Sequence, residues 1–557
     1  MDQKIENQLN LAINIPEDER VRTQDLDTGY NMTENEWELI VKYNGNIETA
    51  AMNIADSLKI LLGGYALVKI KQERIDEFAA LREVIYIEKP KKLYFELENS
   101  GSVSCLDFQY TDSALDGSGV ITAIIDSSVD YRHPDFMTEE GKRIIELYDE
   151  NTGRVYSEDD INAAIDGDLS RVPVEDVSGH GTHVAGIAAG NGRASNGRYR
   201  GVAYKSRLLI VKLGNDLYFS SARLMEALDY VIRKAASLSM PVAINMSFGN
   251  NYGAHDGTSL LETYINAVAD IWQCVIVAGS GNEAARKIHV MHDFAKTAAP
   301  VISTELVIGR YEPSIDIQIW KNYADIYRIT LTAPDGRRYG PVQGDDVITV
   351  FRAGSTEIYV YFGQPSPYSV NQEIFIQMIG ADYISSGIWI IEAEALDVRD
   401  GIYHMWLPAG NFVSSDTGFT KSSPDVTLTI PSTSYNVITV GAYNGRTGSY
   451  ADFSGRGYTR VIRTVKPDIV APGVNIMSPA PGGGYSVQSG TSMAAPFVTG
   501  TAALLMQWGI VKGMDPYMYG AKIKAQLIRG AVPLRSVPVP SERAGWGALC
   551  VRKSIPD

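Results

Sequence analysis

Short apolar runs that alternate with helical patterns constrain the fold of this 557-residue chain more than any other feature. Each run suits a strand buried on both faces, and segments with helical periodicity lie between the runs. Parallel strands need such crossover helices, so the alternation predicts an α/β fold with a doubly wound, mostly parallel sheet. Strands are predicted at residues 120–126, 207–212, 241–246, 274–278 and 437–440, and helices at 221–237 and 260–271.

Three polar residues stand at the borders of predicted elements, in contexts that suit nucleophilic catalysis. Asp126 ends an apolar run, His180 begins the run His-Gly-Thr-His-Val-Ala-Gly, and Ser492 lies in Gly-Thr-Ser-Met-Ala-Ala-Pro. A serine hydroxyl is a poor nucleophile until a neighbouring base takes its proton, and a buried carboxylate holds that base in one tautomer. The pattern predicts Ser492 as nucleophile, His180 as base and Asp126 as the orienting acid.

Each motif taken alone has a plainer interpretation. Asp126 could be an ordinary residue of a turn after a strand, and Ser492 could begin a packed helix. His180 and His183 lie three residues apart and could form a metal pair, but no Glu or third ligand follows them in the zincin pattern. We expect His183, one helical turn beyond His180, to be a structural core histidine.

The order Asp, His, Ser and the motifs around these residues resemble the subtilisin-like serine proteases. The resemblance implies that Asn282, in the run 275–283, donates to the oxyanion together with the backbone N–H of Ser492. It also implies that an edge formed by Ser247, Phe248 and Gly249 pairs with extended substrate. The opposite wall of the first specificity pocket would be formed by Ala278, Gly279 and Ser280.

The resemblance covers residues 105–282 and 432–550. Its later segments are 432–442, 453–455, 466–473 and 545–547. We therefore expect a catalytic domain in two pieces, 97–283 and 431–557. Between the pieces, residues 284–430 contain short, often alternating strands separated by turn signals such as Pro334-Asp335-Gly336. This pattern predicts an inserted all-β sandwich of the jelly-roll type.

The first 96 residues are predicted to form a separate module. Period and turn signals give the order β-α-β-β-α-β, which resembles a ferredoxin-like subtilase propeptide. Such a propeptide packs on two surface helices of the protease and assists its folding. Its tail passes through the active site and is expected to be cut between residues 92 and 101, with residues 90–92 and 96–101 as a polar linker. An unrelated docking domain is the alternative.

The insert, the propeptide and an N-terminus without a secretory signal resemble the clostridial spore-germination proteases of the Csp type. That branch performs limited proteolysis, which activates a cortex-lytic hydrolase zymogen, and its members tend to keep the cleaved propeptide bound. Some members have lost triad residues, whereas Asp126, His180 and Ser492 are present here. Two alternatives remain: another intracellular subtilase, or a catalytically silent scaffold that serves as a binding or signalling module with its cleft blocked by the propeptide.

Composition narrows the partners and the location. The formal net charge of −16 argues against nucleic acid or an anionic membrane surface as a partner. No segment was expected to be long and apolar enough to span a bilayer. Three widely spaced cysteines (Cys105, Cys274 and Cys550) do not form a disulfide framework. We expect a monomer after processing, made inside the cell and incorporated in the spore, whose partners are its own propeptide and a protein substrate.

No cofactor is expected. Asp135 matches a position that binds calcium in secreted subtilisins, so it is a weak calcium candidate. The partner loop, residues 191–200, carries three arginines, which weakens the case for a cation site. A solvated aspartate in a turn is the alternative.

Overall fold

The computed structural model describes residues 3–95, 115–138, 143–214, 218–297, 299–344, 348–410, 412–461, 463–535 and 537–556. These residues fall into two compact units. Unit 1 comprises Met1–Lys92, Asn250–Leu260 and Ala285–Val426, and unit 2 comprises Leu93–Gly249, Leu261–Ala284 and Thr427–Asp557. Cys105 and the expected cleavage region beyond residue 95 lie outside the described residues.

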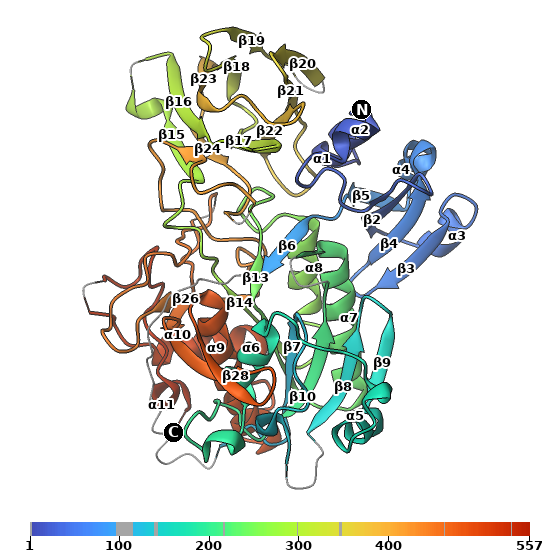
Figure 1. Ribbon diagram of the computed structural model, residues 1–557, viewed down its shortest axis with the longest axis vertical. Helices are drawn as coiled ribbons and strands as arrows, with labels where there is room; N and C mark the ends of the chain where they lie inside the picture. The colour runs from blue at the N-terminus through green and yellow to red at the C-terminus, as the bar shows by residue number, and fades with distance from the viewer. Residues whose placement is uncertain are drawn as a thin grey trace. The chain divides into compact units, whose positions relative to one another are not determined.

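Unit 2 is built on an eight-stranded sheet in the order β27-β26-β14-β12-β7-β10-β8-β9 (Figure 1). All its neighbouring strands are parallel except β8 and β9. Every residue of the central strands is buried, as expected for a sheet covered on both faces. The strands are β7 (Ile121–Asp126), β8 (Ile144–Asp149), β9 (Arg154–Ser157), β10 (Arg207–Lys212), β12 (Val242–Met246), β14 (Cys274–Gly279), β26 (Ile438–Tyr443) and β27 (Ile469–Pro472).

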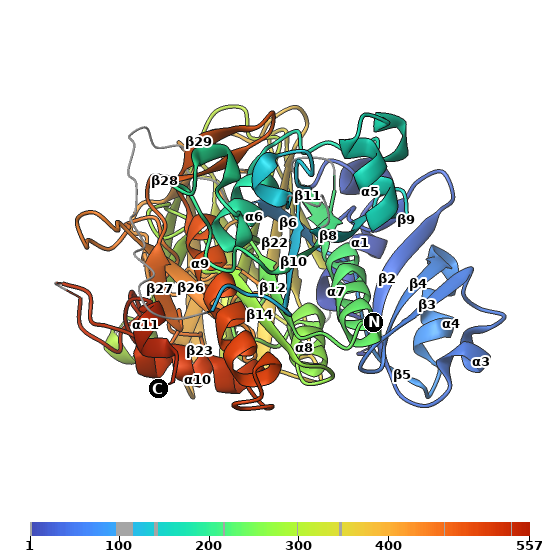
Figure 2. The same ribbon diagram turned by 90° about the horizontal axis from the view of Figure 1, so that it is seen from below.

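Helices pack along this sheet, as Figure 2 shows for α7 and α9. They include α5 (Glu158–Ile165), α6 (His180–Ala189), α7 (Ser221–Ser237), α8 (Leu260–Val268), α9 (Thr491–Met506), α10 (Gly520–Gly530) and α11 (Val551–Ser554). All residues of α6 and α9 are buried, and the two helices contact each other. The predicted alternation of buried strands and helices is therefore confirmed.

One expectation is wrong. The segment Thr491–Val511 is, within the described part of the chain, long and apolar enough to cross a membrane. Its most apolar 18-residue window is 83% buried inside the protein. A helix in the middle of a soluble core must be apolar on every side, so it has the same composition as a membrane span.

Residues up to Lys92 in unit 1 carry an antiparallel sheet in the order β1-β2-β4-β3, with β5 paired to β2. From β2 onwards the elements follow in the order strand, helix, strand, strand, helix, strand. The elements are α1 (Asn7–Asn14), α2 (Glu17–Arg20), β1 (Tyr30–Asn31), β2 (Glu36–Tyr43), α3 (Ile47–Ala51), β3 (Ser57–Leu61), β4 (Tyr65–Lys71), α4 (Ile75–Ala79) and β5 (Val84–Glu88).

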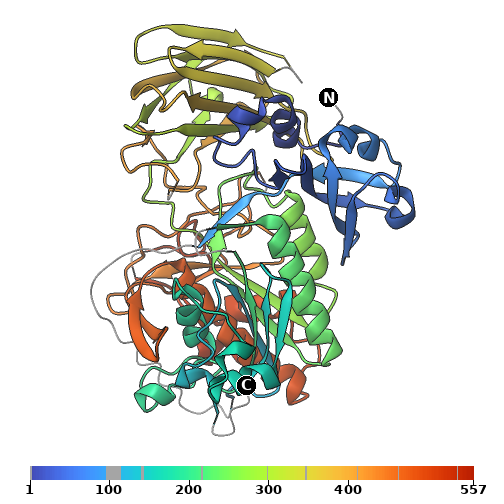
Figure 3. The same ribbon diagram turned by 45° about the vertical axis from the view of Figure 1, so that its right-hand side comes forward.

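The inserted part of unit 1 consists of two antiparallel sheets stacked in layers (Figure 3). Their strand orders are β15-β24-β17-β22-β21-β20 and β19-β18-β23-β16-β25. Alternate residues of both sheets, such as Ile317 and Ile391, share one hydrophobic core. The strands are β15 (His289–Asp293), β16 (Val301–Ile308), β17 (Ser314–Asn322), β18 (Ile326–Thr332), β19 (Arg338–Val342), β20 (Ile348–Ala353), β21 (Thr356–Phe362), β22 (Asn371–Gly380), β23 (Gly387–Asp397), β24 (Ile402–Trp406) and β25 (Gly418–Phe419).

A second core joins the N-terminal residues to the insert. Leu9 and Leu11 of α1 belong to the same buried cluster as Tyr361 and Phe375 on β21 and β22. Polar bonds reinforce the contact, because the Asn7 side chain donates to the carbonyl of Gln364 at 3.0 Å. The N-terminal residues are therefore packed on the insert inside unit 1.

The lysines predicted as linker are instead part of the fold. Lys91 forms an ion pair with Glu6, and Lys92 forms one with Asp27 at 3.1 Å. Lys92 also begins a further strand, β6 (Lys92–Phe95). The prediction of a linker at 90–92 is wrong because local polarity does not reveal these distant acidic partners.

Candidate active site

The end of β7 and the start of α6 bring Asp126 and His180 together. Asp126 Oδ1 lies 2.6 Å from His180 Nδ1, and both side chains are fully buried. The close approach depends on Gly181, because a Cβ there would lie 1.9 Å from the carbonyl oxygen of Ser128. Gly179 precedes the helix with φ +72°, a backbone conformation that glycine adopts without strain. The Gly-His-Gly motif thus has a local steric reason.

Ser492 is the second residue of α9, where backbone N–H groups of the first turn are free of intrahelical bonds. Its hydroxyl donates to the carbonyl oxygen of Ser247 at 3.2 Å, and the Ser247 hydroxyl donates to the carbonyl oxygen of Ser492 at 3.2 Å. The start of α9 is therefore fastened to the segment that follows β12. Since β12 pairs with β7, Ser492 and Asp126 are held at the same edge of the sheet.

Asn282 follows β14, the next strand of the sheet, and its side chain is oriented by its neighbours. Its Oδ1 accepts the backbone N–H of Thr491 at 3.0 Å and the Thr491 hydroxyl at 3.2 Å. These bonds identify the other amide atom as the donor. The buried Nδ2 has no hydrogen-bond partner among the residues that the structure describes. A buried N–H group without a partner is costly in a resting protein and suits an oxygen that arrives with the substrate.

The residues predicted to line the substrate site lie on adjacent strands of unit 2. Phe248 and Gly249 form the short strand β13 (Phe248–Gly249), directly after Ser247. Ala278 and Gly279 end β14, which pairs with β12, and Ser280 follows them. The four of these residues that are not glycine are buried, namely Ser247, Phe248, Ala278 and Ser280.

The predicted substrate edge is occupied by the chain itself. β6 lies between β13 and β11 (Tyr218–Ser220), and it pairs antiparallel with β13 through Phe95 opposite Phe248 and Tyr94 opposite Gly249. The Phe95 ring lies 5.4 Å from the His180 ring and 5.4 Å from the Phe219 ring, measured between centroids. A strand added at this edge places an aromatic side chain beside the histidine.

Asp176 is a site residue that the sequence reasoning missed. Its carboxylate accepts the Ser127 hydroxyl at 2.8 Å, the Gly179 N–H at 3.0 Å, and the N–H and hydroxyl of Thr182 at 2.8 and 2.6 Å. Burial raises the pKa of Asp176, while the bonds from Thr182 and Ser127 act in the opposite direction. The signal available in the sequence was its place four residues before His180.

Replacing Asp176 by asparagine is expected to lower the free energy of unfolding by about 3 kcal/mol, because buried donors then face an amide N–H. Urea denaturation measures this change. The exposed Asp166→Asn, in the same part of unit 2, is the matched control and should change stability by less than about 0.5 kcal/mol. Equal midpoints for the two variants would contradict the role of Asp176 in fixing the start of α6.

His183 and Asp135 have partners that do not belong to catalysis. Burial lowers the pKa of His183 to about 3, so the ring is neutral, and its Nε2 donates to the carbonyl of Ile476 at 3.0 Å. Asp135 is buried, and its two carboxylate oxygens accept the Ala194 N–H and the Tyr485 hydroxyl, each at 2.8 Å.

The surroundings of Asp135 do not fit a calcium ion. Both carboxylate oxygens already accept hydrogen bonds, and the buried Arg143 guanidinium donates to the backbone carbonyl oxygen of Asp135 at 2.9 Å, so a positive charge already lies beside this residue. Within the described ranges no group of three or more His, Cys, Asp or Glu side chains could hold a metal ion. The alternative of a solvated aspartate is also wrong, since the side chain is buried.

Comparisons with known proteins agree with this geometry. The subtilase family matches residues 117–330 and 398–547, and the Csp protease B prodomain matches residues 3–91. The solved structure of the Clostridium perfringens CspB protease is 35% identical with a TM-score of 0.76, over 81% of this chain and 95% of that chain. Fervidolysin from Fervidobacterium pennivorans, 16% identical with a TM-score of 0.50 over 93% of this chain and 61% of its own, shares the fold.

Among curated proteins, the minor extracellular protease Vpr of Bacillus subtilis is 25% identical over 82% of this chain and 53% of its own length. A subtilisin from Bacillus sp. is 29% identical over 39% of this chain and 48% of its own length. The chain thus spans about half the length of these curated relatives.

Proposed function

Because this chain belongs to the subtilase family and carries a Csp protease B prodomain, we propose that it is a serine endopeptidase. It cuts itself after the prodomain and then cuts a protein substrate at a limited number of positions. The observation that carries the proposal is the buried Asp126–His180 pair at 2.6 Å. It lies at the end of the sheet where Ser492 stands in the first turn of α9 and where β6 already lies as an extended peptide.

In the proposed reaction, the Ser492 oxygen attacks the scissile carbonyl while His180 Nε2 takes the hydroxyl proton. Asp126 holds the proton on Nδ1 and stabilises the imidazolium. The carbonyl oxygen becomes an oxyanion, which accepts Asn282 Nδ2–H and the Ser492 N–H. Collapse of the intermediate expels the amine, which receives the proton from His180. Water then attacks the acyl-enzyme by the same route and frees Ser492. No cofactor takes part.

The proposed domains are a prodomain at 1–96 with a ferredoxin-like arrangement, an insert at 284–430 of the jelly-roll type, and a catalytic domain at 97–283 and 431–557. The sheet order β5-β2-β4-β3 and the two stacked antiparallel sheets support the first two assignments. The core shared by α1 with β21 and β22 supports a further step: the cut prodomain stays bound, because cutting near residue 96 leaves all of these contacts intact.

The chain of β6 suggests what the cleft accepts. Leu93, Tyr94 and Phe95 are at most 7% exposed, and Tyr94 also contacts Tyr218. A peptide that replaces β6 gains backbone hydrogen bonds for any sequence, and large apolar side chains fill the same places. We propose that the preferred substrate segment is extended and aromatic, on a cortex-lytic hydrolase zymogen in the spore, and that the processed protease acts as a monomer. The match to a Csp protease B prodomain supports this branch.

Labelling with a biotinylated fluorophosphonate, in buffer with EDTA, tests the proposed activity. The probe reacts with a serine only when a base activates it. We expect the wild type to be labelled at Ser492, as located by mass spectrometry of peptides, and expect no label on His180→Ala. Ser449→Ala, which changes an exposed serine, is the matched control and should be labelled fully.

The same experiment distinguishes the protease from the second candidate function, a catalytically silent scaffold. The position of β6 on the substrate edge favours a silent scaffold if the prodomain never leaves that edge. Absence of label on the folded wild type would support the scaffold and refute the protease. Labelling that resists EDTA would also agree with a reaction that needs no metal ion.

A further inference from the structure

Six charged side chains are buried where the N-terminal residues meet the insert within unit 1. Each is at most 9% exposed. Two ion pairs lie within the N-terminal residues, Lys89 with Asp25 at 2.6 Å and Lys91 with Glu6. The insert contributes two more acids, Asp316 on β17 and Glu373 on the neighbouring strand β22.

The charges of this cluster do not balance if every group is ionised. The two lysines are each bonded to one acid of the N-terminal residues, so Asp316 and Glu373 are left over. Asp316 Oδ2 accepts the Tyr252 hydroxyl at 3.3 Å, and its Oδ1 has no hydrogen-bond partner within the described residues. Glu373 Oε1 accepts the Gln8 amide at 2.9 Å. Neither bond supplies a positive charge.

Burial and the neighbouring acids favour the protonated form of both side chains, and other neighbours oppose it. Burial, and after it the charge of Asp25, raises the pKa of Asp316 to about 8, against the opposing effects of Tyr252 and Lys89. Burial raises the pKa of Glu373 to about 7, with Glu6 adding to the effect and Gln8, Lys91 and Asn7 opposing it. The other titratable groups facing this cluster are Tyr86, Glu88 and Tyr361.

We propose that the prodomain docks on the insert with a proton on Asp316 and a proton on Glu373, and that their loss loosens this contact. In the docked state both acids keep their protons to neutral pH or above. In the released state they lose them near the ordinary value of about 4. Between these limits the docked state binds more protons, so docking weakens as pH rises.

Of the two lysines, only Lys89 opposes this effect. Burial lowers the pKa of Lys89 to about 8. Its charge is therefore kept while Glu373 ionises and is lost over the same range as the proton of Asp316. Lys91 keeps its charge at higher pH still, since its pKa is raised by Glu6 against the effect of burial. Ionisation of the two acids therefore dominates between pH 6 and pH 8.

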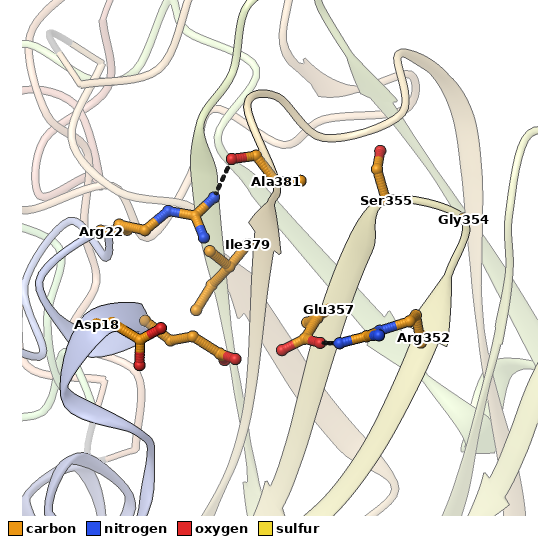
Figure 4. A pocket seen from close by; sticks show the side chains of 9 residues that line it. Asp18, Arg22, Arg352, Gly354, Ser355, Glu357, Ile379 and Ala381 are labelled. Atoms are coloured by element: carbon orange, nitrogen blue, oxygen red, sulfur yellow. Dashed lines mark hydrogen bonds and ion pairs between the residues drawn. The ribbon is translucent and has the colours of Figure 1, made fainter.

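A further contact joins α2 to the insert, but it has no single sign, because the hydrogen bond that raises the pKa of Glu19 lowers the pKa of Glu357. A cavity of about 330 Å³ lies between α2 and the insert, and the Arg22 guanidinium donates there to the carbonyl of Ala381 at 2.7 Å. Figure 4 shows this bond and the pairing of Arg352 with Glu357. Glu19 of α2 lines the same cavity and accepts the Tyr359 hydroxyl. Burial and a hydrogen bond with Glu357 raise the pKa of Glu19.

Hydrogen exchange of the full chain carrying Ser492→Ala tests the proposal. This background cannot cut itself in the proposed mechanism, so the result does not depend on whether the wild type is a protease. Exchange of peptides from α1 is compared at pH 6 and pH 8 after correction for the intrinsic rate. We expect the opening equilibrium to rise at least tenfold. In Asp316→Asn with Glu373→Gln, whose amides cannot ionise, it should rise less than twofold.

Matched controls keep the outcome decisive. Glu34→Gln with Asp335→Asn changes one exposed acid in each part of unit 1 and should keep the tenfold response. If the double amide variant does not fold, the single variant Glu373→Gln should still lose part of the response. A parent chain that shows no pH response, or amide variants that keep the full response, would overturn the proposal.

Discussion

The Ser492→Ala chain is expected to remain uncut, whereas the wild type separates into two fragments split between residues 92 and 101. The physical reason is that Ser492 carries the hydroxyl predicted to attack, whereas the neighbouring hydroxyl at the start of α9, that of Thr491, donates to Asn282 Oδ1 at 3.2 Å. Loss of a triad nucleophile costs roughly 10⁶-fold in kcat in subtilisin. On that scale a cut completed in minutes would take years.

Intact-mass measurement of freshly purified protein decides the matter. The wild type should give two masses that sum to the full chain plus one water, and they locate the cut. Ser449→Ala, at an exposed serine, is the matched control and should be cut like the wild type. A cut in Ser492→Ala at the same bond would assign the cleavage to another protease. An uncut wild type would refute self-processing.

Replacing Asn282 by alanine is expected to slow self-processing by a factor of 10² to 10³ without changing the fold. The Asn282 Nδ2 donor is buried and unbonded in the described residues, so it stabilises only the charge that develops during the reaction. Removal of the corresponding donor in subtilisin costs about 2.7–4 kcal/mol of transition-state stabilisation. A time course of intact masses after refolding gives the first-order rate of the cut.

Asn162→Ala, on the surface of α5, is the control for this variant and should process at the wild-type rate. For substrate added in trans, the loss should appear in kcat, with KM nearly unchanged, because the ground-state carbonyl gains little from the donor. A rise in KM with kcat preserved would instead assign Asn282 to substrate binding. The Thr491 contacts to Oδ1 would then be its main role.

The sheet and the main site residues were predictable because each is encoded locally. The apolar runs ending at Asp126 and Ala278 are long enough to be strands, and the structure has β7 and β14 there. The small residues around His180 are also required locally, because the start of α6 lies close to the backbone of Ser128. Patterns of this kind survive in a single sequence because they depend on residues only a few positions apart.

What escaped prediction depends on residues far apart in the chain. Lys91 looks like a linker residue until Glu6, 85 positions away, lies beside it. Asp176 has no motif of its own, and its hydrogen bonds depend on how α6 docks against the segment after β7. The core shared by α1, β21 and β22 joins residues more than 340 positions apart. The hydrogen bond of Tyr359 with Glu19 also joins distant parts of the chain. No local period or turn signal reports such contacts.

The place of β6 between β11 and β13 has a consequence for the choice of targets. A peptide that replaces β6 must have unpaired backbone N–H and C=O groups along both of its edges, because a strand borders this position on each side. In a strand of a folded sheet, the backbone groups along at least one edge are already hydrogen-bonded. Helices and tight turns offer neither. Under the proposed function, folded proteins are therefore excluded whatever their sequence, and only extended linkers and tails can enter this position. On the same proposal, the geometry of this position limits which proteins can be cut before any side chain is recognised.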